Sequence, residues 1–354
     1  MLMSRLASGL VPYTPGEQPK GGKVIKLNTN ENPYPPSPRA AAAIASFDTS
    51  RLRLYPDPTA DALRAALADA EGVREENVFV GNGSDEVLSL AFAAFFDDAS
   101  APVLFPDVTY SFYKVFCALY RINFEEVRTD GGFAVRVNDY LCRETSGIVL
   151  ANPNAPTGLS LPSGAFRALC AAYPDKVIIA DEAYVDFSPL PSLAVLTAEY
   201  SNLLVVKTFS KSRSLAGGRC GYAIGDASLI RTLRTVKNCF NSYTVNALTA
   251  AAAREAVLDA EYFADCVGKI KATREKTAAA LRGIGFRMTD SGANFLFAEY
   301  PGMSGEELQS ELRARGIIVR RFDSPRIKDF LRITIGTEED MDAFVRACAE
   351  ITGQ

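Results

Sequence analysis

Residues 205–222, VVKTFSKSRSLAGGRCGY, place one lysine, Lys211, between Ser210 and Ser212 at the end of an apolar run. An ammonium group at the end of a buried strand costs free energy unless an acid pairs with it or it has reacted covalently. Arg219 follows, and an arginine beside hydroxyl groups favours a doubly charged anion. The stretch therefore indicates either a structural salt bridge or a lysine nucleophile next to an anion site.

A second chemical group precedes this lysine in the stretch KVIIADEAYVDF. Asp181 ends a strongly apolar run, where an unpaired carboxylate would be costly, so a cationic partner is expected. Thirty residues separate Asp181 from Lys211, which suits one crossover between neighbouring parallel strands. Taken by itself, Asp181 fits a structural cap better than a functional group, and Tyr184 alone could be a core residue. Together with Lys211 they indicate a site with an acid, an amine and an aromatic ring.

The stretch GNGSDEVLSLAFAAFF predicts a strand that ends at Gly81 and a helix that starts near Ser84. The free N–H groups and the positive end of such a helix suit a phosphate group. The alternative is an ordinary turn followed by a helix cap. No Gly-Lys-Ser/Thr follows, so the stretch is not a nucleotide-binding P-loop.

Short β-branched runs alternate with helical stretches, which indicates an α/β protein with a mostly parallel sheet covered by helices on both faces. We expect strands at 78–80, 102–105, 147–151, 176–180, 203–207 and 220–224, and helices near 59–72, 84–96, 110–119, 163–173 and 227–237. A helical region, 245–283, precedes a smaller α+β domain. The predicted division is an N-terminal arm over 1–45 that contributes to the small domain and to a dimer, a large domain over 46–250 and a small domain over 251–354. Ligands bind at the carboxyl ends of parallel strands, so the polar residues at these ends should converge on one site.

The chain has 354 residues, of which 48% are hydrophobic and 23% charged, as in ordinary folded proteins. It contains no histidine, which excludes Ser-His-Asp and Cys-His catalysis, and no metal site is expected. The net charge of −4 argues against nucleic-acid and membrane-surface partners. The sequence has no stretch typical of a signal peptide or membrane span. Its seven cysteines are scattered, as in reduced proteins, so a cytoplasmic location is expected.

Several stretches together resemble the fold-type-I transferases that depend on pyridoxal 5'-phosphate (PLP), and most of all the histidinol-phosphate aminotransferase family. They are LNTNENPYPPSP, YPDP, GNGSDE, PNAPTG, ADEAY, TFSKSRSLAGGRCGY, GANFLF and FLRITIGT, in family order from residue 27 to 337. The combination of ADEAY, the Ser-Lys pair and AGxRxG is specific for the fold and the cofactor. The resemblance implies transamination between L-histidinol phosphate and 2-oxoglutarate in L-histidine biosynthesis, by a homodimer with shared active sites.

The resemblance also implies roles for individual residues. Lys211 would form the covalent bond to PLP, Asp181 would pair with the pyridine nitrogen and Tyr184 would contact the phenolic oxygen. The remaining cofactor-binding residues would be Ser84, Asp85, Tyr110, Ser210, Arg219 and, from the second subunit, Tyr55. The family's cofactor-contacting asparagine usually precedes Pro-Thr-Gly, but that position is Ala155 here. Either Asn154 takes the place of this asparagine, or Tyr184 is the residue on which the phenolic oxygen relies.

The substrate end of the site is predicted from Arg332, which lies in an apolar strand and needs an anion there. The resemblance implies that Arg332 and Arg320 grip the substrate phosphate. Arg321 is the alternative to Arg320, because only one of two successive strand residues can face inward. A salt bridge within the small domain would also explain Arg332. Asn32, Tyr34 and Asn294 are expected to line the same pocket.

Two other activities keep this fold and cofactor: amino transfer to aromatic or other amino acids, and decarboxylation of phosphothreonine in cobalamin synthesis. A PLP-sensing regulator would need an additional DNA-binding domain, for which the N-terminal arm is too short. A catalytically silent binding protein would be expected to have lost Lys211 or Asp181, and both are present.

Overall fold

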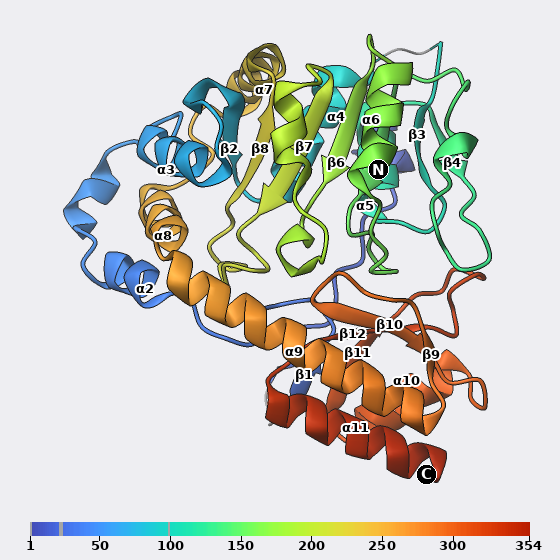
Figure 1. Cartoon of the computed structure of the whole chain (residues 1–354). Coiled ribbons are helices and arrows are strands. Elements are labelled where there is room, and N and C mark those ends of the chain that lie inside the picture. Colours follow the sequence, from blue (N-terminus) through green and yellow to red (C-terminus); the bar gives the residue numbers. More distant parts are fainter. Residues whose placement is uncertain (1, 21–23, 98–99) are drawn as a thin grey trace.

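The computed structural model describes residues 2–20, 24–97 and 100–354. Residues 1 and 21–23 of the predicted arm therefore lie outside the described residues. Two sheets divide the structure, a large one and a smaller one (Figure 1). The long helix α9 (Ala260–Ile284) runs along the boundary between them.

The large sheet has seven strands among the described residues, in the order β2-β8-β7-β6-β5-β3-β4. Strands β7, β6, β5, β3 and β4 are parallel neighbours, whereas β8 is antiparallel to both β7 and β2. The predicted α/β class with a mostly parallel sheet is confirmed. The bounds are β2 (Val78–Gly81), β3 (Val103–Pro106), β4 (Phe124–Val127), β5 (Gly147–Ala151), β6 (Val177–Asp181), β7 (Leu203–Thr208) and β8 (Gly221–Gly225).

Both faces of this sheet are buried, because alternate residues of each strand enter different hydrophobic clusters. In β7, Leu203 and Val205 belong to the cluster formed with α3 (Asp61–Glu71), α6 (Ser163–Ala172) and α8 (Ala247–Leu258). Leu204 and Val206 belong to the cluster formed with α4 (Ser84–Phe95), α5 (Phe112–Tyr120) and α7 (Ala227–Phe240). The sheet thus holds the carboxyl ends of its strands in fixed positions.

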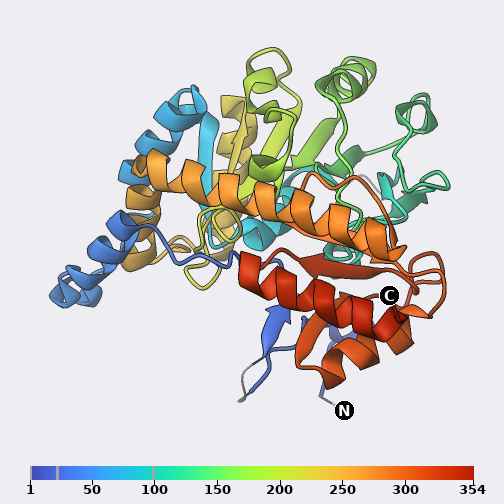
Figure 2. The ribbon, with the colours of Figure 1, turned by 60° about the horizontal axis from the view of Figure 1, so that its bottom comes forward.

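The smaller sheet has the order β1-β11-β12-β10-β9. Its strands are β1 (Ile25–Leu27), β9 (Arg287–Met288), β10 (Phe295–Glu299), β11 (Ile317–Arg321) and β12 (Leu331–Thr334). Helices α9, α10 (Gly305–Ala314) and α11 (Glu338–Thr352) share its hydrophobic cluster, and α9 and α11 lie side by side (Figure 2). Capping boxes begin α10 at Ser304 and α11 at Thr337.

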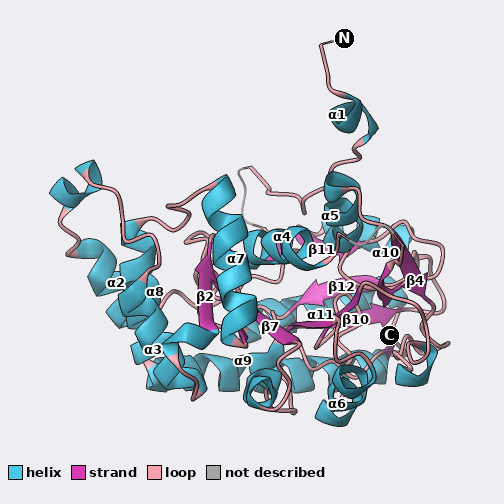
Figure 3. Ribbon diagram, turned by 90° about the horizontal axis from the view of Figure 1, so that it is seen from above, coloured by secondary structure: helices cyan, strands magenta, loops and turns pink. Residues whose placement is uncertain are grey.

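The N-terminal arm is more structured than the sequence predicts. It contains α1 (Arg5–Gly9), β1 and α2 (Pro38–Ala45), and β1 pairs in parallel with β11 of the small sheet. The segment with α1 projects from the body (Figure 3). The sequence also does not predict β4 or β9, since β4 is an edge strand with exposed Glu125 and Glu126 and β9 has only two residues. Across the described residues, the helices are all too short or too polar to cross a membrane.

Candidate active site

A cavity of about 430 Å³ opens where the carboxyl ends of β5, β6 and β7 face the small sheet. Ten of the residues predicted for the site line it, and they come from strands of both sheets, from loops beside the large sheet and from the start of α4. These residues are Ser84, Asp85, Tyr110, Asp181, Tyr184, Ser210, Lys211, Arg219, Arg320 and Arg332. The arm adds Thr29, Asn30 and Glu31 to the wall. The structure thus brings most of the predicted constellation together.

The side chain of Lys211 reaches into this cavity from the loop that follows β7. Its Nζ donates a hydrogen bond to the Thr29 carbonyl at 3.1 Å and lies 5.8 Å from the centre of the Tyr184 ring. Burial, and next the positive charge of Arg332, lower the pKa of Lys211 to about 8. A lysine with such a pKa is partly neutral near pH 7–8, which is the state that attacks a carbonyl carbon.

Asp181, the last residue of β6, is buried at the same cavity, on the strand next to β7. Its carboxylate accepts hydrogen bonds from the Tyr113 hydroxyl at 2.8 Å and from the Ala183 N–H at 3.2 Å. Burial raises the pKa of Asp181 to about 6, although both hydrogen bonds act to lower it. Among the described residues, no lysine or arginine forms an ion pair with Asp181. A ligand with a protonated ring nitrogen would supply the cation that this carboxylate lacks.

The start of α4 forms an anion cradle with Ser210 and Arg219. Gly83, with φ +86°, is the N-cap of the helix and supplies no side-chain cap. Gly83 and Gly221 leave room for the cradle because they have no side chains. A Cβ on Gly83 would lie 2.7 Å from Arg219 Nη2, and a Cβ on Gly221 would lie 2.4 Å from the Ser84 N atom. Helix N–H groups, a hydroxyl and a guanidinium together fit a phosphate dianion.

Arg219 itself adopts a φ of +53°, in the left-handed region that non-glycine residues rarely occupy. Its Nη1 lies 3.5 Å from Ser210 Oγ and its Nη2 lies 3.5 Å from the Asp85 carboxylate. The other oxygen of that carboxylate accepts a hydrogen bond from the Tyr110 hydroxyl at 2.8 Å. Asp85 thus orients both the arginine of the cradle and the ring that borders it.

Two arginines line the cavity from adjacent strands of the small sheet, where Arg320 of β11 pairs with Arg332 of β12. Arg332 Nη2 donates to the Asn28 carbonyl at 3.0 Å, and its buried Nε has no hydrogen-bond partner within the described part of the chain. Arg320 donates to the Thr14 and Pro15 carbonyls at 3.0 and 3.3 Å. Because these partners are neutral carbonyl oxygens, they leave the charge of both guanidinium groups available to an anion.

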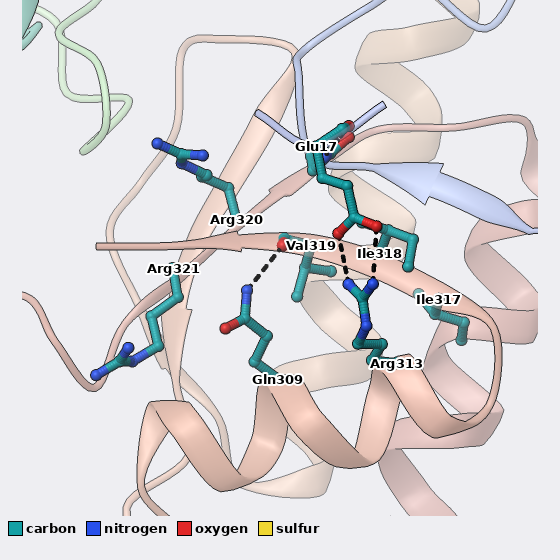
Figure 4. Close-up of a pocket in the computed structure, with 9 residues that line it drawn as sticks. Glu17, Gln309, Arg313, Ile317, Ile318, Val319, Arg320 and Arg321 are labelled. Atoms are coloured by element: carbon teal, nitrogen blue, oxygen red, sulfur yellow. Dashed lines mark hydrogen bonds and ion pairs between the residues drawn. The ribbon is translucent and has the colours of Figure 1, made fainter. Parts of the chain in front are cut away.

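The choice between Arg320 and Arg321 follows from strand alternation. The two side chains leave β11 in different directions (Figure 4), and Arg321 forms an ion pair with Asp323 at 2.8 Å. Only Arg320 lines the cavity. In the neighbouring pocket, Arg313 of α10 forms an ion pair with Glu17 of the arm, and Gln309 donates to the Val319 carbonyl at 3.1 Å (Figure 4). The ion pair of Glu17 fixes the arm to α10, and the bond of Gln309 fixes α10 to β11, the strand of Arg320.

Besides Tyr55, four predicted residues lie outside the cavity lining. The Asn154 amide donates to the Val108 carbonyl and to Thr157 Oγ1, both at 2.9 Å, so it is engaged within the loops, while Ala155 lines the cavity. The Asn32 amide donates to the Lys211 carbonyl at 3.0 Å. The Tyr34 ring lies 5.5 Å from Lys269 Nζ, and Asn294, fully buried, donates to the Asn30 carbonyl at 3.0 Å.

Tyr55 is also away from the cavity. It is 81% exposed and stacks on Tyr243, with ring centres 4.5 Å apart. Tyr55 does not line the cavity in this single chain, and its role from a second subunit stays a prediction.

Sequence reasoning missed two residues that hold the site together. Tyr113 lies in the first turn of α5, three residues after Tyr110, and the helix expected near 110–119 could have indicated that the two rings are neighbours. Asn30 Nδ2 donates to the Tyr184 hydroxyl at 3.0 Å. No local pattern places Asn30 there, because contacts with distant parts of the chain, such as the pairing of β1 with β11, bring the arm to the site.

Comparisons with known proteins agree with this geometry. Residues 22–348 match the model of the family described as aminotransferase class I and II. The chain is 51% identical over 353 residues to histidinol-phosphate aminotransferase 1 of Bradyrhizobium diazoefficiens, covering 99% of this chain and 100% of that protein. It is 49% identical to histidinol-phosphate aminotransferase 2 of Dechloromonas aromatica, covering 99% of both chains.

A solved structure has the same fold. The histidinol-phosphate aminotransferase of Sinorhizobium meliloti, determined in complex with pyridoxal-5'-phosphate, superposes with a TM-score of 0.83 at 24% identity, covering 93% of this chain and 90% of that one.

Proposed function

Because the chain belongs to the family of class I and II aminotransferases, we propose that it transfers an amino group between L-histidinol phosphate and 2-oxoglutarate. The products are imidazole-acetol phosphate and L-glutamate, and the reaction belongs to L-histidine biosynthesis. The observation that carries the choice of substrate is the pair Arg320 and Arg332. It provides a second anion site across the cavity from the cradle of Ser84, Ser210 and Arg219.

PLP is the cofactor for which the cavity provides complementary groups. The α4 N–H groups, Ser210 and Arg219 would hold its phosphate, Asp181 its pyridine nitrogen and Tyr184 its phenolic oxygen. Tyr110 would border the ring. When bound, PLP supplies an electron sink that makes the substrate C–H bond acidic.

Lys211 would hold the cofactor through Nζ and would also move a proton at the substrate carbon. The pKa of about 8 suits both tasks, because an amine near its pKa can accept and return a proton at neutral pH. With no histidine in the chain, no imidazole competes for this role.

We further propose a homodimer with shared active sites. Several large apolar side chains are exposed on and after η1 (Thr49–Arg53) and at the end of α7, which is unusual for a monomer surface. They are Leu52, Leu54, Tyr55, Phe240 and Tyr243. Burial of this patch against a second copy would carry Tyr55 toward the cradle of the partner.

We also propose a division of the chain into domains and a location in the cell. The division into an arm over 1–45, a large domain over 46–250 and a small domain over 251–354 is supported by the separate hydrophobic clusters of the two sheets. A cytoplasmic location is supported by the scattered cysteines and by the nature of the reaction.

The experiment that tests the function compares amino transfer with carbon dioxide release. The PLP-loaded protein is mixed with L-histidinol phosphate, L-phenylalanine or O-phosphothreonine, with 2-oxoglutarate as the amino acceptor. We expect glutamate to form fastest with histidinol phosphate. Preferred reaction with phenylalanine would make the chain an aromatic aminotransferase, and carbon dioxide release from phosphothreonine would make it a decarboxylase.

A further inference from the structure

A second buried group of charges lies behind the active site. Asp181 and Thr208 line the cavity at the ends of β6 and β7. Lys207 belongs to the opposite face of the sheet, because successive strand residues alternate. There it meets Glu71, the last residue of α3, and Tyr222 of β8. The same sheet thus carries polar groups on both faces at one end.

Lys207 is the centre of this cluster and its side chain is only 7% exposed. Its Nζ donates to Glu71 Oε1 at 2.7 Å and lies 3.8 Å from the carboxylate of Asp186, in η4 (Val185–Phe187). The Tyr222 hydroxyl also donates to Glu71 Oε1, at 2.6 Å. Asp186 and Glu71 therefore share one buried cation.

The charges around Lys207 keep it protonated. Burial alone would lower the pKa of Lys207, but Tyr222, Asp186, Glu71 and Glu182 raise it well above its ordinary value. Glu182 accepts hydrogen bonds from Ser192 and from the Leu193 N–H, and burial raises its pKa to about 7. The ammonium is thus a permanent counter-charge to Asp186.

Asp186 links this cluster to the loop of Lys211. Its second oxygen accepts a hydrogen bond from Ser212 Oγ at 2.5 Å, and Ser212 is only 4% exposed. From the other side, the Asn32 amide donates to the carbonyls of Lys211 and Ser212 at 3.0 and 3.3 Å. The backbone that carries the amine is therefore held by the arm on one side and by Asp186 on the other.

We propose that Asp186 and Ser212 are positioning residues for Lys211, and that Lys207 is the buried cation that holds Asp186 in place. The inference rests on the proposed function, in which Lys211 bonds to PLP. Neither Lys207, Asp186 nor Ser212 lines the cavity, so they act through the Lys211 backbone. An amine that must meet a carbonyl carbon loses rate steeply when it is misplaced by a fraction of an ångström.

The test measures the rate at which PLP is taken up by the full-length protein after its cofactor has been removed. In Ser212→Ala we expect uptake about threefold to tenfold slower, the effect of one lost hydrogen bond on a rate. The visible absorption band of the loaded protein should shift as well. Ser228→Ala is the matched control, since it removes a serine bond to a neighbouring carboxylate, that of Asp226, which lies outside the cavity lining and the Lys207 cluster. It should take up PLP at the wild-type rate.

Variants of Asp186 separate the effect of its hydrogen bond to Ser212 from the effect of its charge. They also provide a test if Ser212→Ala does not fold. Asp186→Ala should slow uptake as much as Ser212→Ala, and the double variant should be no slower than either, because both remove the same bond. Asp186→Asn keeps an acceptor but not the charge and should be intermediate. A wild-type rate in Asp186→Asn would overturn the part assigned to Lys207.

Equal rates in wild type, Ser212→Ala and Asp186→Ala would overturn the proposal, as would independent, multiplying effects of the two changes. Borohydride reduction of the loaded wild-type protein, followed by peptide mapping, separates this failure from a failure of the proposed function. If Lys211 carries the label but the rates do not change, only the positioning role is wrong. If another lysine carries it, the role of Lys211 is wrong.

Discussion

The hydroxyl of Tyr113 lies 2.8 Å from the carboxylate of Asp181, and both side chains are buried. Since the hydroxyl donates to the charged carboxylate, it lowers the pKa of Asp181, which burial has raised to about 6. Tyr113→Phe should therefore raise this pKa further, so that Asp181 is neutral over a wider acidic range. We expect the pH profile of PLP uptake by the cofactor-free protein to move to higher pH, with uptake about tenfold slower near pH 6. An unchanged profile would mean that the bond does not affect the charge of Asp181.

Asp181→Asn tests the carboxylate directly. The variant should still bind PLP through the phosphate cradle and Lys211, but an amide cannot stabilise a protonated ring nitrogen. We expect a loss of about a thousandfold in kcat, as for other preorganised electrostatic groups. Cofactor content is measured by absorption in the same samples. A loss of only a few-fold, at full cofactor content, would show that Asp181 does not serve the ring nitrogen.

The amine of Lys211 should titrate near pH 8 in the protein without cofactor. Because the folded pKa is lowered, labelling of Lys211 by an amine reagent should increase with pH and reach half its maximum near 8. Arg332→Gln removes a positive charge that lowers this pKa, so its midpoint should be higher. The matched control is Arg321→Gln, since Arg321 is outside the cavity. Equal midpoints in all three proteins would show that the charge of Arg332 does not affect the pKa of Lys211.

The shared active site can be tested with mixed subunits. A hybrid of Lys211→Ala and Tyr55→Phe subunits should contain one site with both defects and one with neither, if Tyr55 crosses to the partner. Its activity should exceed that of either parent, once subunit exchange has been verified by mass. If exchange occurs without any gain, Tyr55 acts in its own subunit or in neither site.

The sequence predicts most of the large sheet, because its strands are short apolar runs separated by helices of clear periodicity. It also predicts the strand-end chemistry of Asp181 and Lys211, since polar groups after buried strands are unusual. The position of the arm could not be predicted, because Asn30 and Asn32 reach the site through a three-residue strand with little signal of its own. The direction of Asn154 likewise depends on contacts of its side chain with Val108 and Thr109, which only the fold brings near.

The central claim, that the cavity transfers nitrogen from a phosphorylated amine gripped by Arg332, is tested most directly by single-turnover kinetics. PLP-loaded wild type, Arg332→Lys and Arg321→Lys are mixed separately with L-histidinol phosphate and with L-glutamate, and the cofactor absorption is followed. Lysine lacks the planar fork that holds two anion oxygens, so Arg332→Lys should weaken binding of both substrates by about 1.5–3 kcal/mol. Arg321→Lys should resemble wild type. Weakened binding of glutamate alone would contradict the account and favour a general amino-acid aminotransferase.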